Sequence, residues 1–78
     1  MLIIKELLEI LAKSLVDKPD EVVVTQVDSD DVVTLSLRVA QGDVGKVIGK
    51  QGRIAKSIRN LVKAAAVHQN KRVVIEIA

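Results

Sequence analysis

The segment VIGKQGRIAKSIRNL, residues 47–61, decides the fold prediction because two glycines interrupt a pattern that is otherwise helical. Gly49 and Gly52 flank Lys50 and Gln51, so the backbone can turn tightly there with no β-carbon in the way. The apolar residues before Gly49 predict one short helix, which we expect Gly49 to end in a left-handed conformation; a longer helix begins after Gly52. We therefore predict two helices joined by the loop GKQG, whose amides and helix N-terminus can face an anion.

The helix after Gly52 has an apolar side and a basic side. At about 100° per residue, one arc collects apolar side chains. These are Ile54, Ile58, Leu61, Val62 and Ala65. The opposite arc collects polar and basic side chains, namely Arg53, Lys56, Arg59, Asn60 and Lys63. We expect the first arc to pack against a core and the second to face solvent.

The sequence before the glycine loop predicts a helix and a β-hairpin. Apolar residues at helical spacing predict a helix that ends before Pro19. They are Ile4, Leu7, Leu8, Leu11 and Leu15. Two β-branched runs, residues 21–27 and 32–39, are joined by an acidic turn at residues 28–31. Alternation of apolar and polar residues in the second run indicates a half-buried strand.

The chain then completes a small mixed sheet. Residues 71–77 alternate in the same way and predict a third strand. The element order is α-β-β-α-α-β, and the helical crossover allows the second and third strands to be parallel while the hairpin is antiparallel. We predict an α+β fold in a single domain of residues 1–78, with a mixed three-stranded sheet and three helices on one face.

The first helix has more apolar residues than one small sheet would cover. Leu2, Ile3 and Ile10 widen its apolar stripe. Two interpretations remain open at this point, a surface for a partner and an unusually apolar core helix.

Acidic and basic residues are distributed unevenly. Residues 1–43 contain nine acids and four bases, whereas residues 44–72 contain eight bases and no acid. A phosphate-binding surface is typically basic in this way, although a solvated helix face gives the same pattern. The bases nearest to the loop are Lys46, Lys50, Arg53 and Lys56.

Composition excludes several classes of site. The chain contains no Phe, Tyr or Trp, so RNA-binding modules that stack bases on aromatic rings are excluded. It contains no cysteine, and its lone histidine, His68, cannot form a zinc site; we interpret His68 as a cap at the end of the long helix. The N-terminal segment lacks the features of a signal peptide or a membrane span. We expect a cytoplasmic protein with no cofactor, no metal and no membrane partner.

The central segment resembles the signature of the KH domain family, a VIGxxGxxIxxI-like stretch. Val47, Ile48, Gly49, Gly52 and Ile58 match this signature. Ala55 stands where many members have a larger aliphatic residue. The element order is similar to the bacterial type II arrangement. The stretches SLVDKPDEV and KRVVIEI extend the resemblance to short stand-alone bacterial members over almost the whole chain.

This resemblance implies that the chain binds single-stranded RNA, about four nucleotides at a time, through the backbone. The residues that it assigns to the clamp and its surrounding charge are Gly49, Lys50, Gln51, Gly52, Lys46, Arg53 and Lys56. The candidates to form or support an aliphatic groove for the bases are Val47, Ile48, Ile54 and Ile58. It also implies RNA-chaperone activity, a link to cell length and cell-wall synthesis, and a second KH-bearing protein as partner. Because one small groove binds weakly, a homodimer or such a heterodimer would raise affinity by avidity.

Other functions fit the residues less well. A nucleotide P-loop needs four residues between its first glycine and GK, followed by Ser or Thr; Gly45 and Gly49 enclose three, and Gln51 follows. The acidic turn at residues 28–31 lacks the glycine and distal glutamate of a calcium loop. No serine has a recognisable base, so we predict no enzyme and no small-molecule substrate. A protein-interaction module that uses the Gly/Lys surface and a duplex-DNA binder remain as alternatives.

Overall fold

The computed structural model describes residues 4–67 and 71–77, and its elements follow the expected order. The helices and strands are α1 (Ile4–Leu15), β1 (Val23–Asp28), β2 (Val32–Arg38), α2 (Val44–Ile48), α3 (Arg53–Ala65) and β3 (Arg72–Ile77). Three short 3-10 turns separate them: η1 (Pro19–Glu21), η2 (Gln41–Asp43) and η3 (Lys50–Gly52). The first strand begins two residues later than predicted, because Glu21 belongs to the turn that Pro19 starts. The roles expected of Leu2, Ile3 and His68 lie outside the described residues.

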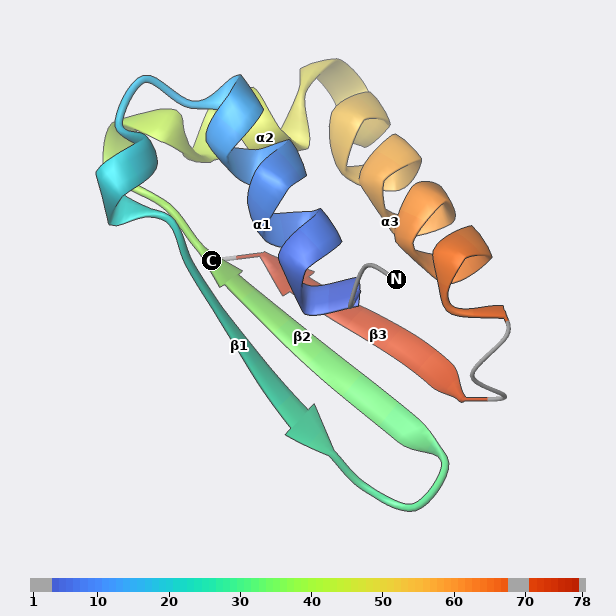
Figure 1. Ribbon diagram of the computed structural model, residues 1–78. Coiled ribbons are helices and arrows are strands. Elements are labelled where there is room, and N and C mark those ends of the chain that lie inside the picture. Colours follow the sequence, from blue (N-terminus) through green and yellow to red (C-terminus); the bar gives the residue numbers. More distant parts are fainter. Residues whose placement is uncertain (1–3, 68–70, 78) are drawn as a thin grey trace.

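The sheet is mixed, as predicted. β2 lies in the centre; it is antiparallel to β1, with Val24 opposite Leu37, and parallel to β3, with Val33 opposite Val73. The three α-helices lie on one face of this sheet (Figure 1). The crossover formed by α2 and α3 is the feature that makes β2 and β3 parallel. The α+β prediction is therefore confirmed.

The core lies between the inner face of the sheet and the helices. The inward residues of β2 are those that the alternation predicted: Val33, Leu35 and Leu37, with Val39 just beyond the strand. Helix residues from α1 and α3 complete this core, namely Ile4, Leu8, Ala12, Ile58 and Val62. This packing fixes α3 over the sheet and so positions the loop that precedes it.

The burial of two residues in the apolar arc of α3 differs from expectation. Leu61 is 50% exposed and Ala65 is exposed, so the prediction that both pack against the core was wrong. In α1, Leu15 of the apolar stripe is 38% exposed. Alanines occupy the buried positions instead: Ala12 in α1, and Ala55 and Ala66 in and after α3. A small side chain lets the helix backbone approach the sheet closely, whereas larger residues are turned to the flanks.

The acidic turn and the glycine loop lie at opposite ends of the molecule. The β1–β2 hairpin projects past the helices, far from the junction between α2 and α3 (Figure 1). The Ser29 N–H donates to the Val32 carbonyl at 2.9 Å and closes the hairpin. Within the described residues, no group of three or more potential metal ligands comes together. None of the helices described is both long enough and apolar enough to cross a bilayer.

Candidate nucleic-acid interface

The backbone of the loop between α2 and α3 has three residues with positive φ. Gly49 has φ 76° and ψ 174°, Gln51 has φ 59° and ψ 25°, and Gly52 has φ 74° and ψ 13°. Gly49 was expected to be the left-handed residue that ends α2; its φ is positive, but its ψ is extended. The left-handed residues are Gln51 and Gly52. Gln51 is the one described residue other than glycine with positive φ, which marks local strain at the tip of the loop.

Gly49 is required by space as well as by conformation. A β-carbon built at Gly49 would lie 2.5 Å from Cγ1 and 2.8 Å from Cβ of Ile54. At Gly52, a β-carbon would meet no atom within 4 Å. The two glycines therefore have different roles: Gly49 allows α3 to pack against the start of the loop, whereas Gly52 provides the turn into α3.

Most amides of the loop are already engaged. The N–H groups of Gly49 and Gly52 donate to the carbonyls of Gly45 and Gly49 at 2.9 and 3.1 Å, and the Arg53 N–H donates to the Lys50 carbonyl. Among the turn and cap hydrogen bonds of the described residues, none is donated by the amide of Lys50 or Gln51, and no side chain caps the start of α3. Both residues are exposed, which leaves the loop tip accessible to an external acceptor.

The cations around the loop tip are of two kinds. Lys50, Arg53 and Lys56 are exposed, and no carboxylate of the described residues lies within 4 Å of their charged groups. Lys46 differs, because its ammonium is bonded to the Asp17 carboxylate and lies 3.7 Å from Oδ1 of Asp43. The hydrogen bond to Asp17, with the nearby negative charges, raises the pKa of Lys46 above its ordinary value. Lys46 is therefore already paired, whereas the other three are available to an anion.

The residues expected to form or support an aliphatic groove differ in burial. Val47 and Ile58 are buried and support the loop from within, whereas Ile48 and Ile54 are half-buried. Ile54 and Leu61 face α1 across a hollow of about 310 Å³, which Leu11 also lines. Of the predicted groove residues, only the side chains of Ile48 and Ile54 are thus open to contact with a base.

The exposed part of α3 has an apolar flank and a basic flank. The apolar flank, with Ile54 and Leu61, borders α1. Lys56, Arg59 and Lys63 project from the other side of the helix, within an arc of about 60° at 100° per residue. Lys63 lines a second hollow with Lys71 and Arg72, at the start of β3, so this basic flank lies toward β3. Both flanks begin at the glycine loop.

Sequence reasoning missed the carboxylates of Asp17 and Asp43. Asp43 precedes Lys46 by three residues, a spacing that brings side chains together on a helix and was a usable signal. Asp17 gave no local signal, because it is separated from Lys46 by 29 residues.

The fold and the glycine loop together define a KH domain with the type II order. The same fold is found in the solved structures of Era, including Aquifex aeolicus Era bound to GDP and aluminium fluoride, with a TM-score of 0.67 and 19% identity. The match covers 95% of this chain and 29% of that Era chain. Era in complex with MgGDPNP and nucleotides 1506–1542 of 16S ribosomal RNA matches with the same TM-score over 28% of its chain.

Comparison of sequences identifies the family. The sequence model of the KhpA/KhpB KH domain family matches residues 5–77. RNA-binding protein KhpA of Clostridium acetobutylicum is 64% identical over 73 residues, 94% of this chain and 97% of that protein. KhpA of Aquifex aeolicus is 46% identical over 95% of this chain and 94% of that protein. The chain belongs to the KhpA/KhpB family of KH domains.

Proposed function

We propose that this chain binds single-stranded RNA and that its GKQG loop holds one phosphate of the RNA backbone. The observation that carries the proposal is the exposed loop tip at Lys50 and Gln51, which lies beside cations that have no carboxylate partner among the described residues. The amides of these two residues donate none of the turn or cap hydrogen bonds found there. Backbone N–H groups next to positive side chains are a common arrangement for phosphate binding. The KhpA relatives are named RNA-binding proteins, which supports the choice of ligand.

Each part of the loop has a distinct task in this proposal. Gly49 and Gly52 set the backbone path, while Lys50 and Gln51 contact the phosphate through their amides and side chains. Arg53 and Lys56 strengthen the positive field. Lys46 adds little to that field, because the carboxylates of Asp17 and Asp43 offset its charge. The half-buried side chains of Ile48 and Ile54 offer apolar surface to a base, and Val47 and Ile58 support them from the core.

Affinity for RNA should be modest and dependent on salt. The chain has no aromatic side chain for stacking, so phosphate contacts supply most of the binding free energy. A second RNA-binding chain would increase the affinity by avidity. We propose a dimer, with another copy or with a second KH-bearing protein, formed by the apolar surface of α1 and α3. Ile10 and Leu61 are 52% and 50% exposed, which supports this location.

The wider role is proposed from the family. We propose that the chain is one non-catalytic domain of residues 1–78, that it acts in the cytoplasm as an RNA chaperone, and that it affects cell length and cell-wall synthesis. The support for these points is the resemblance to KH proteins of this kind. Strand-annealing assays with and without the chain test the chaperone activity directly.

The central test is a variant that changes the loop tip and leaves its glycines intact. We expect Lys50→Asp combined with Gln51→Asp to fold normally and to lose RNA binding, because two carboxylates replace the phosphate-binding groups. Lys5→Asp combined with Gln41→Asp changes the net charge by the same amount away from the loop and should retain most binding. Fluorescence anisotropy with a labelled single-stranded RNA, in competition with duplex DNA, measures both. If the loop variant instead loses a protein partner and the parent chain binds no RNA, the protein-interaction alternative is correct.

A further inference from the structure

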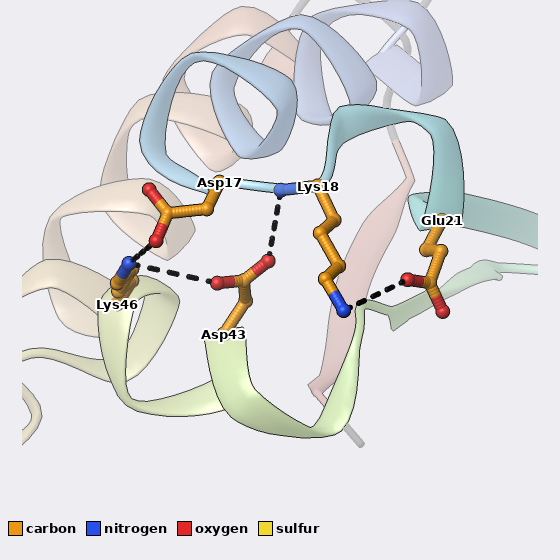
Figure 2. Close-up of polar contacts among 5 residues, drawn as sticks. All are labelled: Asp17, Lys18, Glu21, Asp43 and Lys46. Atoms are coloured by element: carbon orange, nitrogen blue, oxygen red, sulfur yellow. Dashed lines mark hydrogen bonds and ion pairs between the residues drawn. The ribbon is translucent and has the colours of Figure 1, made fainter.

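Lys46 has surroundings unlike those of the other bases near the loop. Its ammonium is bonded to Asp17, two residues after the end of α1, and lies 3.7 Å from Asp43, directly before α2 (Figure 2). For the bases from Lys50 to Arg72, no ion pair within 4 Å is found among the described residues. The pairing of Lys46 is therefore a specific feature of this position.

Asp43 connects Lys46 to the buried part of the structure. It is the one buried charged residue among those described, with 4% of its surface exposed. Its Oδ2 accepts a hydrogen bond from the Lys18 N–H at 3.0 Å, while its Oδ1 faces Lys46 (Figure 2). A buried carboxylate needs such partners, because water is no longer available to it. The cluster of Asp17, Asp43 and Lys46 thus joins the segment after α1 to the first turn of α2.

Helix α2 needs an external anchor of this kind. It has only five residues, and no side-chain cap is found at its start. A helix this short is not stable by itself, so its direction depends on tertiary contacts. Val47 anchors its inner side in the core, and Lys46 anchors its outer side. Gly49 follows directly after α2, so the direction of α2 determines where the loop begins.

The charges around Lys46 also oppose a phosphate contact. One ammonium faces two carboxylates, which leaves the cluster with a net charge of about −1 at neutral pH. A phosphate brought to this ammonium would be repelled by both carboxylates at close range. A phosphate at Lys50 or Arg53 meets no such opposition from the described residues.

We propose that Lys46 is a positioning residue: it fixes α2, and through α2 the GKQG loop, against the end of α1 and makes no contact with RNA phosphate. This proposal rests on the proposed RNA-binding function, and in it Asp17 and Asp43 hold Lys46 in place. Lys50, Arg53 and Lys56 would then interact with the RNA, whereas Lys46 would position the loop.

The salt dependence of RNA binding separates these two roles. Each phosphate contact with single-stranded nucleic acid contributes about 0.7 to the slope of log affinity against log salt concentration. We expect Lys50→Met to reduce this slope by about 0.7. Lys46→Met should leave the slope unchanged and weaken binding about two- to fivefold at every salt concentration. Asp17→Asn should also weaken binding, and the double variant should bind no worse than Lys46→Met alone, because Lys46→Met already removes the contact with Asp17.

Two results would overturn the proposal. One is a slope that falls by about 0.7 in Lys46→Met, which would make Lys46 a phosphate ligand. The other is tighter RNA binding by Asp17→Asn, which would mean that Asp17 only competes with RNA for Lys46.

A second readout keeps the test separate from the RNA-binding proposal. Hydrogen exchange of the Gly52 amide, measured without RNA, should become faster in Lys46→Met and stay unchanged in Lys50→Met. Unchanged exchange in both variants would contradict the positioning role, whatever the RNA measurement shows. A parent chain that binds no RNA, combined with faster exchange in Lys46→Met, would reject the RNA-binding proposal and retain the anchoring role of Lys46.

Discussion

The side chain of Ile54 occupies the space that a β-carbon at Gly49 would need. The distance from that β-carbon to Cγ1 of Ile54 would be 2.5 Å, far below a van der Waals contact. The first turn of α3 therefore packs directly on the peptide that follows α2. This contact sets how closely the two helices approach each other on either side of the loop.

We expect Gly49→Ala to destabilise the fold by about 2–4 kcal/mol, because the added methyl group causes overpacking and the positive φ causes strain. Gly52→Ala is the matched control; it meets open space and should cost only about 1–2 kcal/mol from its left-handed conformation. Urea unfolding followed by circular dichroism measures both values. Equal losses in the two variants would contradict the steric role of Ile54.

Gln51 offers a substitution with opposite effects on stability and binding. Its left-handed conformation is unfavourable for a residue with a β-carbon, so Gln51→Gly should raise stability by about 0.5–1 kcal/mol. RNA affinity should fall, because the side-chain amide is lost from the proposed phosphate site. Unfolding and anisotropy measurements on the same variant test both directions. A variant that is more stable and binds RNA as well as the parent would show that only the backbone of Gln51 matters.

The buried carboxylate of Asp43 contributes to stability through the Lys18 amide. Asp43→Ala leaves that N–H without its acceptor and should cost about 1–3 kcal/mol. Asp43→Asn keeps an oxygen acceptor at the same place and should cost less. Comparison of their urea midpoints tests this order, and a reversed order would mean that the negative charge matters more than the hydrogen bond.

The ion pair between Glu9 and Lys13 on α1 is expected to contribute to the stability of the fold in a pH-dependent way. The hydrogen bond from the Lys13 ammonium, at 2.9 Å, lowers the pKa of Glu9 below its ordinary value near 4.5. Because the folded pKa is the lower one, the pair stabilises the fold above about pH 4.5, and this contribution is lost as the pH falls through the folded pKa. Glu9→Gln should therefore lower the urea midpoint slightly at neutral pH and have no effect in strong acid. Equal effects at both pH values would exclude the ion pair as the cause.

Self-association provides a separate prediction about the surface of α1 and α3. Leu61→Glu should convert a dimer into a monomer in analytical ultracentrifugation, because it adds a charge to the proposed apolar interface. Val27→Glu is the control; this residue is 64% exposed and lies on the sheet. A parent chain that stays monomeric at high concentration would reject the dimer.

The sequence predicted the fold well because its patterns were local. The alternation in β2 and the glycines of the loop determined the elements without knowledge of distant contacts. The orientation of α3 was less predictable. Ala55 and Ala66 are buried while Leu61 is half exposed. Which side of α3 is buried depends on how closely the helix approaches the sheet.

The glycine loop of the candidate site could be predicted from the sequence, but the pairing of the charged residues around it could be predicted only in part. The spacing of Gly49 and Gly52 is a local signal, and the acid-free stretch identified the neighbouring bases. The state of Lys46 depends on Asp17, which lies 29 residues away in the sequence. Charge counts along a chain cannot show which cations are already paired with distant acids, so the sequence could indicate Asp43 as a partner of Lys46 but not Asp17.

The parallel pairing of β2 with β3 has a consequence for the timing of assembly. The hairpin can form early, because its strands are adjacent in sequence, but α3 has its full support only once β3 is in place. A nascent chain in which β3 has not yet been synthesised would hold the GKQG residues without the platform that sets their geometry. The proposed ability of the loop to bind RNA would therefore arise late in synthesis, when the sheet gains its third strand.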